Sequence, residues 1–342
     1  MKFLVIGLGS MGKRRIRNLK ALGYNNIAGF DIRDDRLQEA QEKYGIDIYD
    51  NINLALDKFK PDAFIISTSP DKHMEYAFLG FNNNIHCFIE ASVIDSEKIL
   101  ELYNLSKGKN ILIAPSCTMK YFPMPRKVKE LIQNNTIGKV LYFNYHTGQY
   151  LPDWHPWEDI KEFYVSNPNT GGCREIVPFE LTWINDIFGF NVDVINGFRS
   201  KLSNMDINID DLYQFVLNYE NNTVANITVE VLSKPKASRE LLIIGSQGKI
   251  EYNFDNNELK FINVHMKEYE VVNFSKGTIE NGYINPEEPY INEIKDFVKS
   301  IKLVEKGQKP IFPNDLYRDY QILQTLYKIE DVSIGGLNDL SR

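Results

Sequence analysis

The sequence is poor in cysteine, in long basic blocks and in long apolar runs, and each shortage excludes a class of protein. Cys87, Cys117 and Cys173 are odd in number and have no CxxC spacing, which argues against a disulfide framework and a thiolate zinc site. The formal net charge of -7 gives no general attraction for nucleic acid or anionic membranes. Gly7 and Gly9 interrupt the first apolar stretch, and no later one could cross a bilayer. We therefore expect a cytoplasmic protein without nucleic-acid or membrane partners.

The remaining composition is that of an ordinary globular chain, and its length of 342 residues favours two domains. Over the first half, short apolar runs alternate with amphipathic stretches, which is typical of a parallel sheet covered by helices on both faces. The expected strands are 3–6, 27–31, 63–67, 86–90 and 111–114, and the expected helices are 11–22, 36–44, 72–81 and 96–107. This pattern predicts a Rossmann-type, doubly wound sheet in residues 1–121.

The second half has a different pattern. A helix at 126–134 leads into a strand at 140–145, and from residue 194 onward β-rich segments are separated by Asn and Gly turns. The expected strands are 194–199, 211–219, 223–232, 240–245, 249–252 and 259–263, followed by helices at 289–301 and 315–332. Residues 122–342 are thus expected to form an α+β domain with an open, mostly antiparallel sheet, and the last helix is a candidate to pack back on the first domain.

A glycine-rich turn directly follows the first expected strand and opens the first helix. In Gly7-Leu8-Gly9-Ser10-Met11-Gly12, the first glycine permits a tight turn, the second lets the backbone approach a pyrophosphate, and the third lets helix and strand pack closely. Asp31 ends the next strand about twenty residues on, where a carboxylate accepts hydrogen bonds from ribose hydroxyls. The alternative is a turn whose glycines serve only packing, with Asp31 a solvated strand end.

The same carboxylate bears on which dinucleotide is bound. Asp31 repels a ribose phosphate, so we expect NAD as the cofactor rather than NADP. Arg33 could supply the compensating charge for NADP if Asp31 turned away.

Several further segments resemble the glucose-fructose oxidoreductase and inositol dehydrogenase family, Gfo/Idh/MocA. Thr68-Ser69-Pro70 with His73 is similar to the family's strand-end loop along the dinucleotide, and Lys120-Tyr121-Phe122-Pro123 is similar to its Arg-Phe-x-Pro segment. The stretch from Gly148 to Pro156 resembles a segment that sugar-acting members place beside the substrate, and Gly245-Ser246-Gln247-Gly248 matches a turn of the C-terminal sheet. Each motif is short, but their order and spacing together carry the resemblance.

The resemblance implies a Rossmann domain followed by an α/β domain with an open mixed sheet, and hydride transfer at a carbon of a sugar, cyclitol or nucleotide-sugar substrate. It also implies a homodimer or homotetramer, because the uncovered apolar face of such a sheet needs a partner. The cofactor-binding residues implied by the glycine turn and the resemblance together are Gly7, Gly9, Ser10, Met11, Gly12, Asp31, Arg33, Thr68, Ser69, Pro70, His73 and Glu90.

The chain departs from the family at its proton-handling groups. The family's Glu-Lys-Pro is replaced by Glu90-Ala91-Ser92, so the lysine position holds a residue that cannot donate or accept a proton. In the stretch after Gly171-Gly172, Phe179 falls near the usual histidine, and only Glu175 keeps a carboxylate. Either another set of residues moves the proton, or the dehydrogenase reaction is lost.

Candidates for that replacement set are Lys120, Glu175 and His155 as catalytic groups, with Arg174 as a clamp for an anionic substrate. The alternatives are that Lys120 and Arg174 are solvated surface charges and that Glu175 caps a helix. Tyr121 has suitable chemistry, although an aromatic residue at a strand end is usually a packing group. The histidines have no metal-ligand spacing, so we expect no metal.

Residues 150–159 form an aromatic loop in which carboxylates lie between the aromatic residues, and this loop is the candidate sugar-binding segment. Aromatic faces cover the apolar CH surface of a pyranose, and nearby carboxylates accept hydrogen bonds from its hydroxyls. Four residues of the loop and two named in the preceding paragraph are expected to contact substrate. They are Tyr150, Asp153, Trp154 and Trp157 of the loop, with Tyr121 and Arg174. A domain or oligomer contact is the alternative for this loop.

The sequence thus favours an NAD(P)-dependent oxidoreductase acting on a sugar or nucleotide-sugar. Two rival hypotheses remain. One is an enzyme that retains NAD and uses it cyclically for elimination, hydrolysis or epimerisation, and the other is a non-catalytic dinucleotide-binding subunit.

Overall fold

The computed structural model describes residues 1–154, 156, 158–162 and 164–335. The chain divides into two compact units, one formed by Met1–Thr118 with Pro286–Tyr320 and the other by Met119–Asn285 with Gln321–Arg342. The division at 121/122 expected from the sequence therefore differs from that of the structure, chiefly because Pro286–Tyr320 belongs to the first unit. The cause is packing and charge, since the helix Glu288–Val304 lies against the first helix and Glu293 pairs with Arg15.

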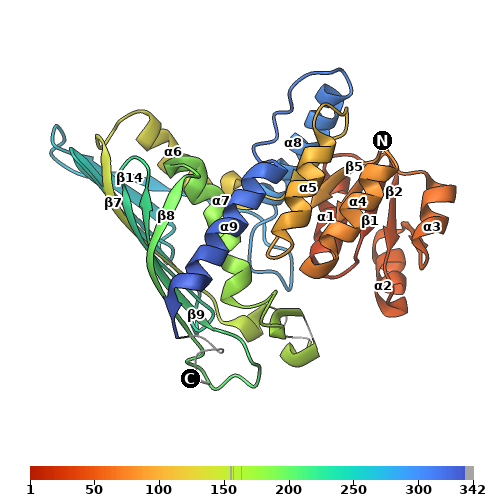
Figure 1. The fold of residues 1–342 in the computed structure, drawn as a ribbon, viewed down its shortest axis with the longest axis horizontal. Helices are drawn as coiled ribbons and strands as arrows, with labels where there is room; N and C mark the ends of the chain where they lie inside the picture. Colours follow the sequence, from red (N-terminus) through yellow and green to blue (C-terminus); the bar gives the residue numbers. More distant parts are fainter. Residues whose placement is uncertain (155, 157, 163, 336–342) are drawn as a thin grey trace. The chain divides into compact units, whose positions relative to one another are not determined.

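The first unit is built on a parallel sheet, which confirms the predicted Rossmann-type fold. Within the described residues its six strands follow the order β3-β2-β1-β4-β5-β6. Figure 1 labels β1, β2 and β5 of this sheet. The central strands are apolar and buried along their whole length, as strands covered on both faces must be. The bounds are β1 Phe3–Ile6, β2 Ile27–Phe30, β3 Asp47–Tyr49, β4 Ala63–Ile66, β5 His86–Ile89 and β6 Ile113–Pro115. The strand order reverses between β1 and β4, and ligands of such sheets bind at the carboxyl ends beside that point.

Helices alternate with these strands along the chain. The helical segments of this unit are α1 Ser10–Ala21, α2 Asp34–Tyr44, α3 Ile52–Leu54, the π-helical η1 Ala55–Phe59, the 3-10 turn η2 Pro70–Lys72, α4 His73–Asn82, α5 Ser96–Ser106 and α8 Glu288–Val304. The 3-10 turn η3 Thr118–Tyr121 and α9 Leu316–Val332 each contain residues of both units. α1 begins at Ser10, so the glycine turn leads directly into its first turn.

The second unit contains a mixed sheet of nine strands among the described residues, in the order β14-β13-β12-β11-β7-β10-β9-β8-β15. Only β7 with β10 and β8 with β15 pair in parallel, so the prediction of an open, mostly antiparallel sheet is confirmed. The bounds are β7 Val140–Gly148, β8 Val192–Ser200, β9 Leu212–Tyr219, β10 Val224–Glu230, β11 Ser238–Gly245, β12 Gly248–Asn253, β13 Glu258–Asn263, β14 Glu270–Asn273 and β15 Ser333–Ile334.

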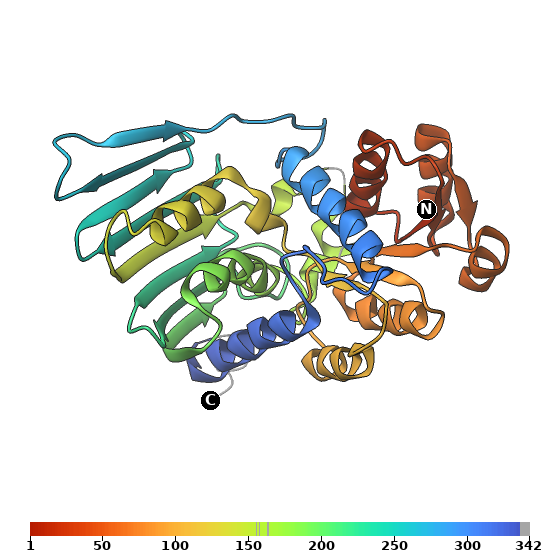
Figure 2. The ribbon, with the colours of Figure 1, turned by 90° about the horizontal axis from the view of Figure 1, so that it is seen from above.

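The helices of this unit cover one face of its sheet (Figure 2). They are α6 Pro123–Gln133 and α7 Cys173–Phe188, with short 3-10 turns η4 Leu151–Asp153, η5 Ile160–Glu162 and η6 Tyr164–Ser166 in the loop between β7 and α7. Burial alternates along β7, as expected for a strand with one covered face. Phe143 and Tyr145 are buried, while Tyr142 and Asn144 are half-buried. The implied homo-oligomer stays a prediction. No helix in the described part of the chain has the length and apolarity needed to span a membrane.

Candidate functional site

The glycine turn has the geometry that its spacing predicts. Gly7 has φ +88°, and a Cβ on it would lie 2.7 Å from the carbonyl oxygen of Ser67, at the carboxyl end of β4. A Cβ on Gly12 would lie 1.9 Å from the carbonyl oxygen of Gly7. On Gly9 the same atom would meet only the Arg36 guanidinium, at 3.5 Å. The first and third glycines are thus required by close backbone packing, and the second leaves a bare cradle of the kind that a pyrophosphate occupies.

Asp31 is fixed beside this turn. One carboxylate oxygen accepts a hydrogen bond from the backbone N–H of Leu8 at 2.7 Å, and the other accepts one from the N–H of Arg33 at 3.0 Å. The residue is 5% exposed. Two backbone donors hold the carboxylate in one orientation, so Asp31 is not the freely solvated strand end of the alternative interpretation.

Two arginines lie near Asp31, of which only Arg33 was considered in the sequence analysis. The guanidinium of Arg33 forms a forked pair with Asp35, at 3.0 Å and 2.5 Å, which engages it with a carboxylate. It is Arg36 whose guanidinium lies 4.0 Å from the Asp31 carboxylate and against Gly9. Sequence reasoning missed Arg36, although its place in the first turn of the second helix was a signal.

The loop after β4 carries two buried polar atoms without a hydrogen-bond partner in the described chain, the hydroxyl of Thr68 and Nδ1 of His73. The other ring nitrogen of His73 lies 3.0 Å from the carbonyl oxygen of Thr68. Burial lowers the pKa of His73, which favours the neutral ring. Buried polar atoms are normally satisfied, so these two are suited to a ligand that lies along the loop. Ser69 and Pro70 complete the segment.

Glu90 is held from within the first unit. Arg15 of α1, whose side chain is fully buried, donates to both of its carboxylate oxygens, at 2.6 Å and 2.9 Å, and the Ser67 hydroxyl donates at 3.3 Å. The same guanidinium lies 3.0 Å from a carboxylate oxygen of Glu293, which is also fully buried. Glu90 therefore links α1, through Arg15, to the loop after β4, through Ser67. A contact of Glu90 with the cofactor stays a prediction.

The residue after the missing lysine position, Ser92, belongs to a buried serine–aspartate pair. Ser92 hydrogen-bonds to the carboxyl group of Asp319 in α9, and burial raises the pKa of Asp319 to about 7. Sequence reasoning did not find Asp319, which is far away in the chain. Asp319 is 3% exposed, and its hydrogen bond holds Ser92, the residue next to Ala91.

In the second unit, the predicted cations are engaged by carboxylates. The ammonium of Lys120 donates to Asp186 of α7 at 3.0 Å, and Lys129 donates to the other oxygen of that carboxylate. Burial acts to raise the pKa of Asp186, but the two ammonium groups outweigh it and hold that pKa below its ordinary value. Lys120 is thus neither a solvated surface charge nor well placed as a general base.

Arg174 is likewise not the free anion clamp expected from the sequence. Its guanidinium pairs with Glu330 at 2.7 Å and donates to the carbonyl oxygen of Asn169. The neighbouring Glu175 instead accepts a hydrogen bond from the phenol of Tyr164 at 2.7 Å. The structure therefore brings Glu175 together with a tyrosine that sequence reasoning missed.

The aromatic loop is described only in part, and His155 and Trp157 lie outside the described residues. Asp153 is exposed, and the ring of Tyr150 carries the ammonium of Lys234 at 4.8 Å from its centroid. The indole N–H of Trp154 is buried without a hydrogen-bond partner among the described residues. Such a donor suits a ligand oxygen.

Three other predicted site residues, Tyr121, Met11 and Ser10, have local contacts or positions that the structure defines. Tyr121 is buried, with Arg126 over its ring at 5.2 Å, which favours its packing role. Met11 accepts a weak contact from Arg14 through its sulfur, and Ser10 begins α1.

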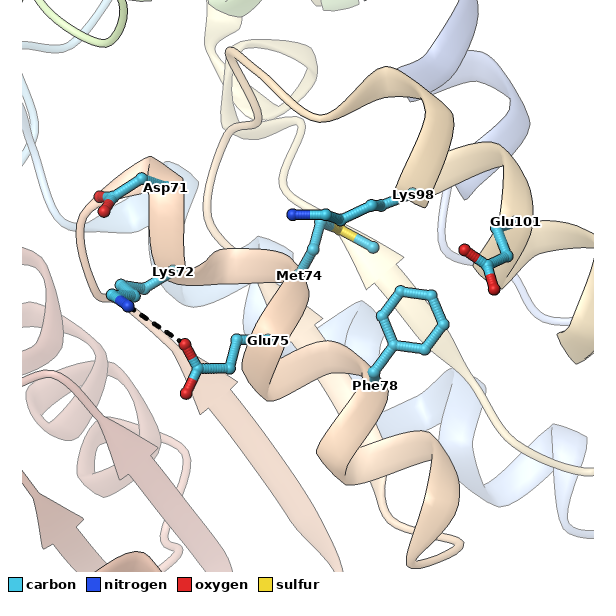
Figure 3. A pocket seen from close by; sticks show the side chains of 7 residues that line it. All are labelled: Asp71, Lys72, Met74, Glu75, Phe78, Lys98 and Glu101. Atoms are coloured by element: carbon cyan, nitrogen blue, oxygen red, sulfur yellow. Dashed lines mark hydrogen bonds and ion pairs between the residues drawn. The ribbon is translucent and has the colours of Figure 1, made fainter.

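A surface hollow of about 460 Å³ lies elsewhere on the first unit (Figure 3). It is lined by Asp71, Lys72, Met74, Glu75, Phe78, Lys98 and Glu101, none of which is a predicted site residue. Lys72 and Glu75 pair across part of it, as the figure shows. Both of its lysines form surface ion pairs, Lys72 with Glu75 and Lys98 with Asp95, and we assign the hollow no role in the site. No group of three or more metal-binding side chains occurs in the part of the chain that the structure describes.

A Rossmann unit with a bare glycine cradle and a fixed strand-end carboxylate, in a chain with a second, mixed-sheet unit, is the arrangement of a two-domain dinucleotide-binding protein. Residues 1–114 match the family model described as "Oxidoreductase family, NAD-binding Rossmann fold", and residues 126–251 match the "GFO/IDH/MocA C-terminal domain". The chain belongs to the Gfo/Idh/MocA oxidoreductase family, and its first unit is an NAD-binding domain. The resemblance inferred from short motifs is thereby confirmed.

Individual relatives are more distant. The myo-inositol 2-dehydrogenase of Thermotoga maritima is 27% identical over 145 residues, which span 41% of this chain and 42% of that protein. A levoglucosan dehydrogenase in complex with NADH superposes with a TM-score of 0.81 at 16% identity, covering 97% of this chain and 96% of that one. A UDP-N-acetylglucosamine 3-dehydrogenase from Acidithiobacillus ferrooxidans gives 0.75 at 17% identity, with 97% of each chain covered. At these identities the structural likenesses show the fold.

Proposed function

We propose that the protein is an NAD-dependent oxidoreductase that acts on an alcohol or carbonyl carbon of a sugar, cyclitol or nucleotide-sugar. The observation that carries the proposal is the Asp31 carboxylate, fixed by two backbone amides beside the open cradle at Gly9. Bound NAD supplies the hydride-transfer chemistry, and the protein supplies binding and orientation. The names of the relatives, which include a cyclitol, a sugar and a nucleotide-sugar dehydrogenase, support this substrate class.

Residues of the first unit would hold the dinucleotide. Backbone N–H groups from Gly9 to Gly12 would face the pyrophosphate, and Asp31 would accept hydrogen bonds from the adenosine ribose. The unpartnered Thr68 hydroxyl and His73 nitrogen would take up polar groups farther along the cofactor. In the second unit, the buried indole N–H of Trp154 is the best supported contact for a sugar oxygen.

Ala91 favours a second candidate function. Alanine has no side-chain group that can donate or accept a proton. Its presence at this position suits an enzyme that keeps its NAD and completes an elimination, hydrolysis or epimerisation, because such reactions place their acid and base groups differently. A non-catalytic dinucleotide-binding subunit would also lack the lysine.

One experiment separates these functions. Purified protein is mixed anaerobically with NAD or NADH and a panel of sugars, cyclitols and sugar nucleotides, while nicotinamide absorbance and sugar products are followed together. We expect absorbance changes that depend on one class of sugar. New sugar products at constant absorbance would support the NAD-retaining enzyme instead. Binding of NAD without any product would support the non-catalytic subunit and contradict both enzymes.

The cofactor preference gives a sharper prediction. The fixed Asp31 carboxylate repels a 2′-phosphate, so we expect wild type to bind NAD at least about tenfold more tightly than NADP. In Asp31→Ser the repulsion is gone and Arg36 remains nearby, so the ratio should fall by about 10- to 100-fold. Calorimetric titration with both dinucleotides measures it. Asp34→Ser removes an exposed carboxylate from the same helix start and should leave the ratio unchanged. Equal NAD and NADP affinities in wild type would refute this role of Asp31.

A further inference from the structure

Arg36 lies at the open side of the glycine cradle. It belongs to the first turn of α2, and two atoms of its guanidinium group lie 3.5 Å and 3.8 Å from the position that a Cβ on Gly9 would take. A guanidinium nitrogen also lies 4.0 Å from a carboxylate oxygen of Asp31, and the Arg36 side chain is 30% exposed. All three residues belong to the first unit. The guanidinium is therefore close to both the bare backbone of the cradle and the fixed carboxylate, with access to solvent.

An arginine is an unfavourable choice for the start of its own helix. The first turn of a helix carries a partial positive charge, which favours acidic side chains and disfavours a cation. The acidic residues Asp34 and Asp35 occupy the first turn of α2 as this rule expects, and the basic residue Lys43 lies in its last turn. Arg36 is the exception in this helix. Such a departure from the local rule is typical of a position that serves a site.

The start of α1, which forms the cradle, has no acidic side chain of its own. Gly9 is the N-cap of α1 and has no side chain to cap the helix, and the first turn contains no acidic residue. The Asp31 carboxylate accepts from the N–H groups of Leu8 and Arg33 instead. A helix start supplies only about half a positive charge, whereas a diphosphate carries a full negative charge on each phosphate group. A cation beside the cradle would therefore strengthen the binding of a diphosphate.

A neighbouring lysine shows what a cation committed to a structural ion pair looks like. Lys13 of α1 donates to both carboxylate oxygens of Glu39 in α2, at 2.8 Å and 2.7 Å. The distance of 4.0 Å between Arg36 and Asp31 is longer than a hydrogen bond. Ribose hydroxyls that bind to Asp31 would thus replace a loose ion pair, and the Arg36 guanidinium could turn to another anion at small cost.

We propose that Arg36 is a cofactor-binding residue whose guanidinium pairs with the diphosphate of the bound dinucleotide at the open side of the cradle. A guanidinium presents a planar fork of N–H donors that matches phosphate oxygens. Arg36 would hold the diphosphate together with the backbone N–H groups from Gly9 to Gly12, while Asp31 exchanges its ion pair for the ribose hydroxyls. The inference rests on the dinucleotide binding within the proposed function, and it involves no residue of the second unit.

The test compares Arg36→Met, Arg36→Lys and the matched control Lys13→Met with wild type by calorimetric titration of the whole chain with NAD. We expect Arg36→Met to bind NAD about 10- to 100-fold more weakly, because charge-assisted hydrogen bonds to phosphate are lost. Arg36→Lys should lose no more than about fivefold, because an ammonium still binds phosphate as a point charge. Lys13→Met removes the same charge from α1 and should change the affinity less than about threefold. Urea unfolding of each variant shows whether the first unit stays folded.

The outcomes separate this inference from the proposed function. An NAD affinity of Arg36→Met that equals that of wild type would overturn the role of Arg36 and leave the oxidoreductase standing. Equal losses in Arg36→Met and Arg36→Lys would also overturn it, since the guanidinium plane rather than its charge would then matter, as in stacking on the adenine ring. An equal loss in Lys13→Met would do the same, because the general charge of the region would then account for the effect.

The oxidoreductase itself is judged by sugar turnover, which this titration does not use. If wild type turns over no sugar but Arg36→Met alone binds NAD at least tenfold more weakly, the oxidoreductase fails and the role of Arg36 stands. If wild type binds no NAD, both fail.

Discussion

Replacing Gly7 by alanine is expected to weaken NAD binding by about 100-fold or more and to destabilise the first unit. The new Cβ would lie 2.7 Å from the carbonyl oxygen of Ser67 and 2.9 Å from the backbone nitrogen of Thr68. Both contacts are with backbone, so the ends of β1 and β4 must separate. That movement shifts the cradle, and a misplacement of roughly 1 Å is enough to cost about 100-fold where a bound group must be held in position. Calorimetric titration with NAD and urea unfolding measure the two effects.

Gly23→Ala is the matched control, because Gly23 has φ +84° against +88° for Gly7 but no atom within 4 Å of its Cβ position. Both variants carry the cost of a left-handed alanine, about 1–2 kcal/mol. Only Gly7→Ala adds a steric clash at the cradle. Gly23→Ala should therefore lose some stability and keep its NAD affinity. Equal NAD affinities in the two variants would show that the turn at Gly7 does not shape the dinucleotide site.

The elements that were predictable from sequence are those whose burial leaves a local pattern. β1, β4 and β5 are short apolar runs buried on both faces, and the expected bounds differ from the observed ones by at most one residue. β3 was not predicted because three residues, one of them an exposed aspartate, carry no periodicity. β14 was missed for a similar reason, since this edge strand is mostly exposed and does not alternate.

The residues of the candidate site also fall into those that a local sequence pattern predicts and those that it does not. The glycine turn and Asp31 were predictable because their chemistry lies in one strand–turn–helix segment and the strand that follows it. The partners of the charged residues were not, since Lys120 meets Asp186 and Arg174 meets Glu330 only through the fold. Tyr164 had a weak local signal, its position shortly before Gly171-Gly172, but it was one aromatic residue among several. Charge alone does not tell an ion-paired lysine from a catalytic one.

Arg15→Met is expected to lower the free energy of unfolding by about 3–5 kcal/mol near neutral pH. Arg15 is fully buried between Glu90 and Glu293 and lies over the ring of Phe88. Methionine keeps much of the apolar contact but leaves two carboxylates in the first unit without their shared cation. Burial would by itself lower the pKa of Arg15, yet the two carboxylates outweigh it and raise that pKa, which shows how strongly this charge is held. Breaking such a pair is costly because the remaining charges are desolvated.

The loss should depend on pH with a defined sign. Burial raises the pKa of Glu293 above its ordinary value even with Arg15 present, and removing the cation raises it further. A carboxyl whose folded pKa is raised favours the folded state below its unfolded pKa, and that stability is lost as pH rises toward the folded pKa. The deficit of Arg15→Met should therefore be small near pH 4 to 5 and grow toward pH 8, as measured by urea unfolding across this range.

Two further variants decide whether the stranded carboxylates cause this loss. Arg17→Met removes a partly exposed cation from the same helix, whose partner Glu287 keeps its hydrogen bonds from Arg14 and Asn18, so it should cost no more than about 1 kcal/mol. Adding Glu293→Gln to Arg15→Met removes one stranded charge and should restore part of the stability at pH 8, where the deficit is largest. A deficit that is independent of pH, and unchanged in the double variant, would mean that lost packing rather than uncompensated charge destabilises the protein.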